Sequence, residues 1–472
     1  MSDTQVAIAQ QLTHQQPSLI CPNYEFVQLP PTQGQDHTLL PTPIDITFEL
    51  PAVTYNLAKS EISCNLRVNN IRTNTDAEAL GNYNWIHTSF PSFCGHIQFG
   101  DAQNRKIVDI PDLDRYCSTV YSPFTPAVDT LTAGKPRLNL PTNLFGSTIT
   151  GDNNWSPGLD VAIGDAQSNK SGFEPQHLIR SAQSGGALET GGSAMFLRIR
   201  IPLGRLGLHT ILNQDKDFYF GRIMYLRLQI NPANRVCFAS GGVDNPTAAL
   251  VNNGVVNSPG PRLEAMTLFL AVEKNLAIHN DFQLRYNNGG ITYFTDNVTA
   301  YNRAFIRNDN GQDSINIKIN RYYGKKLKYV IWCPYGQDNL NGNNGVRYVV
   351  NPPDGITFIT NFYTQIDNQR LQQFNINVEE YQHWLLQKEK LKGSSIFDPV
   401  AYTRRQFAWI DDFTGSEPYI SKPDADCGLA LDQERDYRVI LQNANPTVAK
   451  TLYVYVVASQ TLHVKPEMMA YE

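Results

Sequence analysis

The feature that most constrains this chain is a pair of apolar runs near its C-terminal end. The stretch from Tyr437 to Val464 holds two runs rich in Val, Leu and Tyr, at Tyr437–Leu441 and Leu452–Val457, with Asn and Pro residues between them. β-Branched and aromatic residues bounded by turn formers predict adjacent strands, and Leu462–Val464 is a candidate third strand.

Two segments of the first half resemble this strand pair. LRLQINPAN at 226–234 is similar to YRVILQNAN at 437–445, and TLFLAV at 267–272 is similar to TLYVYV at 451–456. Two copies of one strand pair predict two copies of one domain.

A third match falls in the same order along the chain. NRKIVDIPDLDRY at 104–116 resembles QRLQQFNINVEEY at 369–381. With Ile107 matched to Leu371, Arg227 to Arg438 and Leu268 to Leu452, the offsets between the copies are 264, 211 and 184 residues. They decrease as expected if the first half carries extra loops of about 53 and 27 residues, where the irregular segments 122–194 and 239–261 lie. The alternative is that any two β-sandwiches share short alternating runs. Three ordered matches favour a duplication.

Length and composition suit such a duplication. A chain of 472 residues accommodates two all-β domains of roughly 200–230 residues each. Hydrophobic residues make up 41%, enough for two cores, while charged residues at 18% lie below the roughly 25% of an average globular protein. Plentiful Gly, Pro and Asn favour many short strands joined by turns.

Charge argues against nucleic-acid binding. The net charge is −5, and no Lys or Arg precedes Lys59, whereas binding to phosphates requires clustered basic residues. The Gln- and Pro-rich residues 1–42 have little periodicity and predict an extended arm that does not neutralise phosphate.

Most of the remaining regular structure is predicted as strands. Ile44–Leu50 alternates apolar with polar residues, as in a sheet with one solvated face. Segment 262–277 is rich in helix formers, so a helix is the alternative there, but its match to TLYVYV favours a strand. The other predicted strands are Ile62–Val68, Leu197–Ile201, Leu226–Ile230, Ile291–Phe294, Ile315–Ile319 and Leu327–Trp332.

Two helical segments are predicted. Pro111 and Asp112 begin one or two helical turns. A longer helix has Val378, Tyr381, Trp384 and Leu385 on one face and ends at Gly393 after three lysines.

The cysteines and the N-terminal residues indicate the cellular compartment in which the protein folds. Seven scattered cysteines without a CxxC pair predict reduced thiols in an intracellular protein. The first residues lack a basic and an apolar region, so no secretory signal is predicted, and no run of 18 apolar residues predicts a membrane span. Asn154, Asn169 and Asn297 begin glycosylation patterns, which we attribute to chance.

The sequence shows no catalytic or metal-binding pattern. The Gly-rich segment 184–192 lacks the spacing of a phosphate-binding loop, and the nine histidines show no metal-ligand spacing. Asp309–Asp313 lacks the terminal Glu of a calcium loop and predicts a turn. We therefore assign no catalytic, cofactor-binding or metal-binding residues and no cofactor.

Two carboxylate pairs and three tryptophans are the residues that a glycosidase site would require. Asp411-Asp412 and Glu379-Glu380 are adjacent in sequence, so their side chains point in different directions and are predicted to be solvated charges. Three tryptophans could stack on sugars, but core packing is the better explanation; they are Trp332, Trp384 and Trp409.

At the level of its pattern the chain resembles the double jelly-roll major capsid proteins of double-stranded DNA viruses. That lineage includes adenovirus hexon, tectivirus-like phages, nucleocytoplasmic large DNA viruses, virophages and polinton-like viruses. The residues that carry the resemblance are IDITFELPAVTYNLAKSEISCNLRVNN at 44–70, the strand–turn–helix passages 97–116 and 362–385, IPLGRLGLHTILNQDKDFYFGRIMYLRLQI at 201–230, KKLKYVIWCPY at 325–335, and Tyr437–Val464.

The resemblance implies an all-β fold of two tandem jelly-roll β-sandwiches with short helices and long inserted loops. It divides the chain into an extended N-terminal arm (1–42), a first jelly roll with inserted loops (43–280), a second jelly roll (281–465) and a C-terminal tail (466–472). Because the insertions are modest, we expect no tall outward tower.

The resemblance also implies a structural role without enzymatic activity. Homotrimers would form pseudo-hexameric capsomers of an icosahedral shell, located in the virion and assembled inside the host cell. Further partners would be neighbouring capsomers and minor capsid or penton proteins, without sequence-specific nucleic-acid binding; an underlying membrane stays open.

Two alternatives belong to other classes. A capsid protein of an RNA virus commonly uses a basic arm to hold the genome, and residues 1–42 carry no basic residue. A secreted or intracellular carbohydrate-binding or glycoside-cleaving β-sandwich protein would require a carboxylate pair in a groove, which the sequence does not show.

Overall fold

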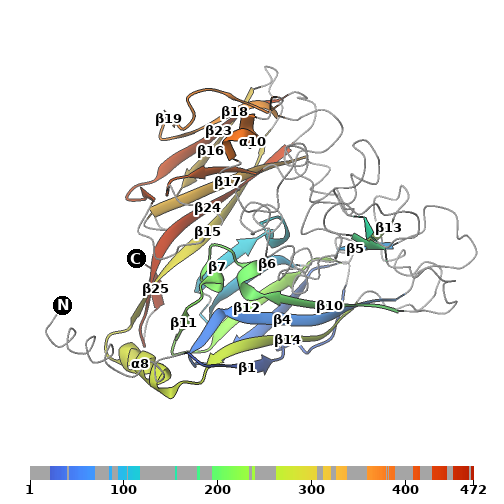
Figure 1. Cartoon of the computed structure of the whole chain (residues 1–472), viewed down its shortest axis with the longest axis vertical. Coiled ribbons are helices and arrows are strands. Elements are labelled where there is room, and N and C mark those ends of the chain that lie inside the picture. Colours follow the sequence, from blue (N-terminus) through green and yellow to red (C-terminus); the bar gives the residue numbers. More distant parts are fainter. Residues whose placement is uncertain are drawn as a thin grey trace, which may run out of the picture.

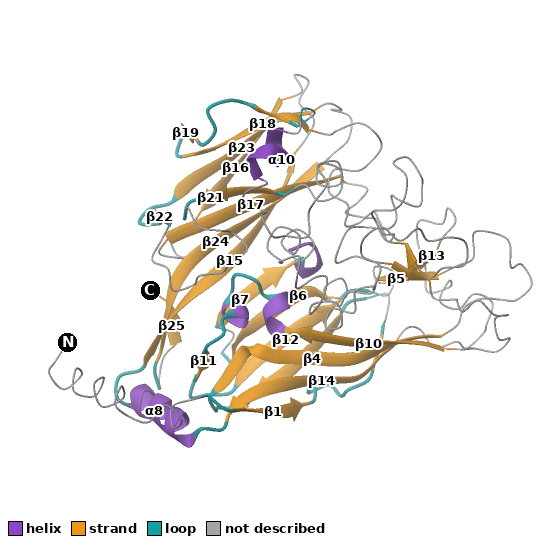
Figure 2. Ribbon diagram, viewed as in Figure 1, coloured by secondary structure: helices purple, strands orange, loops and turns teal. Residues whose placement is uncertain are grey.

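The computed structural model shows mainly β-strands arranged in several sheets (Figures 1 and 2). The residues that the structure describes are 22–39, 42–69, 84–87, 94–103, 105–116, 155–156, 178–180, 194–232, 237–239, 262–305, 312–319, 326–336, 359–378, 380, 382–387, 408–414, 428–443, 450–466 and 469–471.

The first jelly roll consists of two sheets with the orders β1-β14-β4-β10 and β3-β12-β6-β7. Two short strands, β2 (His37–Thr38) and β11 (Asp217–Phe218), extend the first sheet. The main strands are β1 (Tyr24–Leu29), β3 (Ile44–Leu50), β4 (Tyr55–Asn69), β6 (Cys94–Asp101), β7 (Lys106–Pro111), β10 (Ala194–Pro202), β12 (Met224–Ile230) and β14 (Arg262–Glu273).

The second jelly roll repeats this topology. Its sheets have the orders β15-β24-β17-β21 and β16-β23-β18-β19, so each strand occupies the place of one strand in the first roll. The main strands are β15 (Ile291–Phe305), β16 (Gln312–Ile319), β17 (Lys326–Gly336), β18 (Ile359–Ile366), β19 (Gln369–Arg370), β21 (Trp409–Asp412), β23 (Arg435–Asn443) and β24 (Lys450–Val464), with the short additions β20 (Ile376–Asn377), β22 (Leu429–Ala430) and β25 (Met469–Tyr471).

The matching orders confirm the predicted duplication at the level of fold. β12 and β23, which contain the first matched pair, are both second in their sheets, and β14 and β24 hold equivalent places in the other sheets. Segment 262–273 is a strand, as its match to the C-terminal run predicted.

Alternation explains how these strands form a core. In β12 buried and partly exposed residues alternate along the whole strand. Leu226 lies opposite Phe48 of β3 and Phe99 of β6, and all three side chains are buried. The side-chain period of two therefore places one face of the sheet in the core and leaves the other face outside.

A small third sheet is built from the long connections of the first roll. Its order is β13-β5-β9-β8, and it lies apart from both rolls (Figure 1). The strands are β5 (Asn84–His87), β8 (Trp155–Ser156), β9 (Leu178–Arg180) and β13 (Cys237–Ala239). Segments that the sequence marked as irregular therefore contribute strands.

Helix α8 (Leu276–Asn287) joins the two rolls (Figure 2). The Asn275 side chain caps it by accepting a hydrogen bond from the backbone N–H of Ala277 at 3.0 Å. Gly221 has a φ of +65°, and an added Cβ would meet the Tyr286 ring at 2.2 Å, so glycine permits the close approach. The predicted domain boundary at 280 lies inside this unpredicted helix.

Predictions for both chain ends are partly wrong. Residues 24–29 of the predicted arm form β1, an edge strand paired with β14 from Tyr24↔Glu273 to Leu29↔Leu268, and β2 also pairs with β14. Within the predicted tail, β25 pairs with β24. These short segments become strands because an existing sheet edge offers them hydrogen-bond partners.

Two smaller predictions also need correction. Leu462–Val464 is not a separate strand but the continuation of β24. The helix predicted to include Val378 begins at Gln382 as α10 (Gln382–Gln387), and Leu385 is exposed. The helical turn predicted from Pro111 and Asp112 is confirmed at 113–116, and the first roll also contains the short helices α5 (Leu203–Leu206) and η3 (Ile211–Asn213).

Several predictions lie outside the described residues. They concern most of the irregular segments 122–194 and 239–261, the Gly-rich segment 184–192, the turn at 309–311, Glu379, Tyr381, the side chain of Trp384, and residues 388–393 with their lysines and glycine cap.

Candidate assembly surfaces

Within the described residues no group of three or more His, Cys, Asp or Glu side chains is placed to hold a metal ion. No helix in that part of the chain is both long and apolar enough to cross a membrane. Cys64, Cys94 and Cys333 are buried and form no disulfide, as predicted for reduced thiols, and burial raises the pKa of Cys64 to about 12.

Asp411 differs from its prediction as a solvated charge. It is buried in the second roll and accepts three hydrogen bonds, at 2.6 Å from the Tyr437 hydroxyl, 2.9 Å from Trp409 Nε1 and 3.1 Å from Gln372 Nε2. These donors stabilise a carboxylate that burial alone would penalise. The arrangement makes Asp411 a structural link between β21 and β23.

Two tryptophans lie in the same core, as predicted. The Trp332 and Trp409 rings meet the Phe362 ring edge to face, at centroid distances of 5.0 and 4.8 Å. Both are almost fully buried. Neither offers a face for stacking on a sugar.

The outer face of sheet β15-β24-β17-β21 is directed toward the first roll. Trp332 points into the core of its own roll, and its neighbour in β17, Cys333, lies opposite Tyr453 of β24. Because side chains alternate along a strand, Tyr453 and Tyr455 project from the other face. The first roll covers them, and they are 5% and 0% exposed.

The contact between the rolls is aromatic and polar. The Arg115 guanidinium donates to the Tyr453 hydroxyl and lies 5.0 Å from the ring centroid, an arrangement that stabilises a cation over an aromatic face. The Tyr116 ring meets Tyr455 edge to face at 5.1 Å. Both first-roll residues come directly after β7, which contacts β15.

A second part of the contact involves the backbone. The Tyr219 N–H donates to the Tyr293 hydroxyl at 2.8 Å, and that hydroxyl donates to the Tyr219 carbonyl at 3.0 Å. Burial raises the pKa of Tyr293, so the hydroxyl keeps its proton. These two hydrogen bonds restrict the position of one roll relative to the other.

Buried charges occupy the same outer face of the second roll. Lys328 Nζ and Asp296 Oδ1 form an ion pair at 2.7 Å, with both side chains 2% exposed. The ring of His209, from the first roll, packs against Tyr329 at 5.7 Å. Burial, and to a lesser extent the charge of Lys328, lowers the pKa of His209 to about 3.

Because of the low pKa of His209, we expect the folded protein to be less stable in acid. The pKa of His209 is about 3 in the folded protein and about 6.5 in the unfolded chain. The contribution of His209 to the free energy of unfolding is therefore complete above pH 6.5, and it falls by about 1.4 kcal/mol per pH unit below that pH. Burial lowers the pKa of His383 to about 3 as well. We expect the free energy of unfolding, measured with urea, to fall between pH 6.5 and 4.5.

The matched variant is His209→Asn, which has no titrating ring and tolerates the φ of +59° at this position. It should be less stable at pH 7, because the smaller side chain leaves a void, but should lose stability less steeply with acid. An unchanged slope would contradict the assignment to His209.

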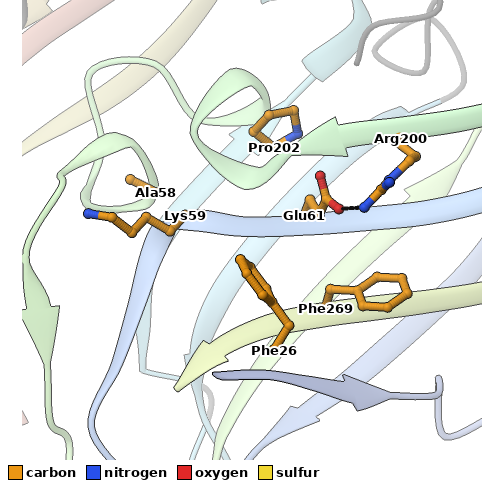
Figure 3. Close-up of a pocket in the computed structure, with 7 residues that line it drawn as sticks. All are labelled: Phe26, Ala58, Lys59, Glu61, Arg200, Pro202 and Phe269. Carbon is orange, nitrogen blue, oxygen red and sulfur yellow. Dashed lines mark hydrogen bonds and ion pairs between the residues drawn. The ribbon is translucent and has the colours of Figure 1, made fainter. Parts of the chain in front are cut away.

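The outer face of the equivalent sheet in the first roll is open. A groove of about 690 Å³ runs over β1, β4, β10 and β14 (Figure 3). Phe26 and Phe269 form its apolar floor on one side, and Glu61 and Arg200 form an ion pair on the other. Phe26 is 55% exposed, so more than half of this aromatic side chain faces solvent in the groove.

A second groove, of about 400 Å³, lies on the outer face of sheet β3-β12-β6-β7. His96 Nε2 lies 2.5 Å from Asp109 Oδ1, and Lys106 Nζ lies 3.0 Å from Asp109 Oδ2. Burial would raise the pKa of Asp109, but hydrogen bonds from His96, Lys106 and Gln98 lower it to about 2. This cluster is a charged network with a fully ionised carboxylate at neutral pH.

Comparison with solved structures identifies the fold. The chain is similar to a chain of the Sputnik virophage (TM-score 0.55, 12% identity, covering 96% of this chain and 89% of that chain). It is also similar to the PBCV-1 virus capsid (0.53, 8%, 96% and 97%) and to the Faustovirus major capsid protein (0.52, 10%, 94% and 91%). The chain therefore has the double jelly-roll fold that the sequence predicted.

Sequence comparisons add nothing to this likeness, because no family model and no curated protein matches the chain. Sequence reasoning also missed the residues of the contact between the rolls. Arg115 and Tyr453 are separated by 338 positions, and no local pattern joins them. The available signal was the repeat itself, which pairs Tyr453 with Phe269 through TLYVYV and TLFLAV.

Proposed function

We propose that this chain is a major capsid protein of a double-stranded DNA virus, which forms homotrimeric, pseudo-hexameric capsomers. The observation that carries the proposal is the repetition of one eight-stranded topology along the chain, in a fold shared over at least 94% of this chain with capsid structures. The units of the proposal are a first roll over 24–273 and a second over 291–471, joined by α8.

Physical reasoning connects the two rolls to a shell. Two similar rolls in each of three chains give six similar wedges, and a closed ring of them makes a finite block. Such a block has nearly equal sides and tiles a surface. Contacts between blocks are then weak individually, because many of them act together across the shell.

The proposed role defines the partners and the location. The partners are further copies of this chain, first within a trimer and then in neighbouring capsomers, together with minor capsid or penton proteins. The protein belongs to the virion and assembles inside the host cell. We assign it no enzymatic activity, because its role is to build the shell.

The proposal predicts a specific particle. The purified protein should sediment as a trimer at micromolar concentration and appear in electron micrographs as three-fold particles with a hexagonal outline. A stable trimer is expected because obligate oligomers bury roughly 2,000 Å² or more at their interfaces. A clean monomer under these conditions would count decisively against the proposal.

A further inference from the structure

We propose that residues 1–21 of this chain bind to the exposed face of α8, the helix that joins the two rolls. The described part of the chain begins at Pro22, so the occupant is the segment that precedes β1 in the same copy. Because the contact lies within one copy, the proposal does not depend on the trimer.

Helix α8 packs against the protein through one face only. Phe282 lies against the hydrophobic core, and Tyr286, four residues later, is buried and meets the Tyr219 ring edge to face at 5.4 Å. Residues four apart lie on the same side of a helix. The side of α8 that faces away from Phe282 and Tyr286 therefore has no partner among the described residues.

This exposed face is uncharged. Leu276 and Leu284 are 72% and 61% exposed, and the other exposed residues between the two ends of the face are Ala277, Asn280, Gln283 and Asn287. The charges of Asp281 and Arg285 pair with each other at 2.7 Å. The outer face of a surface helix normally carries charged residues, whereas leucines and amides occupy this one, so it suits an uncharged and partly apolar partner.

The chain enters β1 beside the first turn of α8. The Lys274 N–H donates to the Asn23 carbonyl at 2.7 Å, and the Asn23 N–H donates to Glu273 Oε1 at 2.9 Å. The same carboxylate oxygen accepts from the N–H of Asn275, the capping residue of α8, at 2.7 Å. Glu273, only 6% exposed, therefore holds the end of the proposed binding segment at the start of the helix.

Strand direction leads residues 1–21 towards α8. β1 runs antiparallel to β14 with Tyr24 opposite Glu273, so the chain that precedes Tyr24 is directed past the end of β14, where α8 begins. A segment of 21 residues spans up to roughly 70 Å when extended, whereas a helix of 12 residues is about 18 Å long. The segment can therefore reach the whole exposed face.

The composition of residues 1–21 matches this face. The segment contains no Lys, Arg or Glu and a single Asp, and its large aliphatic residues are Val6, Ile8, Leu12, Leu19 and Ile20. So few apolar residues cannot form a core of their own, and they need another surface for burial. Attachment at Asn23 gives the segment an effective concentration of roughly millimolar at α8, which favours it over the same segment of another copy.

Photochemical cross-linking of the full chain tests the contact. A photoreactive phenylalanine analogue replaces Leu284, and chymotrypsin digests the product, because it cuts after Leu12, Leu19 and Tyr24. Trypsin is unsuitable, since no Lys or Arg precedes Lys59. We expect a link from position 284 to a peptide of residues 1–21, in a product that keeps the mass of one chain on a denaturing gel.

The matched control carries the same probe in place of Phe374, which is 51% exposed. Phe374 follows β19, at the opposite end of the molecule from α8 (Figure 1), so no link to residues 1–21 is expected. Adding Leu276→Asp to the chain with the probe at 284 places an unpaired charge on the face and should abolish the link. Far-ultraviolet circular dichroism checks that each variant is folded.

Native proteolysis supplies a measurement without a probe. In the double variant Leu276→Asp/Leu284→Asp, chymotrypsin should cut after Leu12 roughly 5- to 30-fold faster than in the wild type, because cleavage follows the population of the released segment. The matched control is Phe374→Asp, which should leave this rate unchanged.

Three results would overturn the proposal. They are a probe at 284 that gives no link to residues 1–21, links that join two copies of the chain, and a cleavage rate after Leu12 that the double variant does not raise. None of them bears on the proposed function, because the oligomeric state of the wild type is measured separately by sedimentation.

Discussion

The double variant Leu226→Asp/Leu228→Asp is expected not to fold. Both leucines are buried in the central strand β12, at 0% and 1% exposure. Burying an unpaired carboxylate costs several kcal/mol, and each lost leucine removes roughly 2–3 kcal/mol of apolar burial. The sum approaches the roughly 5–15 kcal/mol that stabilises a whole domain.

The measurement is soluble expression followed by limited proteolysis. The control is Arg227→Ser, since Arg227 lies between the two leucines on the opposite face and lines the smaller groove. Its guanidinium lies over the Tyr225 ring at 5.7 Å, a contact at the surface of the sheet whose loss should cost about 1 kcal/mol or less. A soluble and protease-resistant double variant would show that β12 is not a core strand.

The single variant Lys328→Met is expected to destabilise the protein by about 3–5 kcal/mol. Both members of its ion pair with Asp296 are buried, so removing the lysine leaves a buried carboxylate without its ion-pair partner. The double variant Lys328→Met/Asp296→Leu should recover most of this loss, because apolar residues of similar volume often replace a buried pair without cost.

Urea unfolding of the four proteins in this double-mutant cycle supplies the test. The control is Lys318→Met, which breaks an exposed pair with Glu434 and should change stability far less. Lys328→Met should also flatten the acid response, because the lysine contributes to lowering the pKa of His209. If the single variant were as stable as the wild type, the pair would have no structural role.

The strands that could be predicted from sequence are those with a strong local pattern. Ile44–Leu50 and Leu226–Ile230 alternate in sequence and also in burial. β1 was missed because four of its six residues are exposed, so no apolar face marks it. α8 was missed for a related reason, since Tyr286 is its only residue assigned to the buried class.

The candidate surfaces could be predicted less well, because they depend on the tertiary structure. The repeat could assign Phe269 and Tyr453 to equivalent places, but not that one is open and the other covered. Asp411 shows the same limit, because two of its three donors, Tyr437 and Gln372, lie 26 and 39 residues away. Sequence proximity therefore suggested a solvated pair where the fold buries one member.

The sequence by itself determined that the chain is all-β and that one sandwich occurs twice, because side-chain periodicity and turn residues are local properties that survive in both copies. Only the tertiary structure decided which segments complete the sheets and which faces are covered. Those outcomes depend on contacts such as that of Arg115 with Tyr453. The residues of such contacts lie far apart in the chain and become buried only when they meet, so no local sequence pattern indicates them.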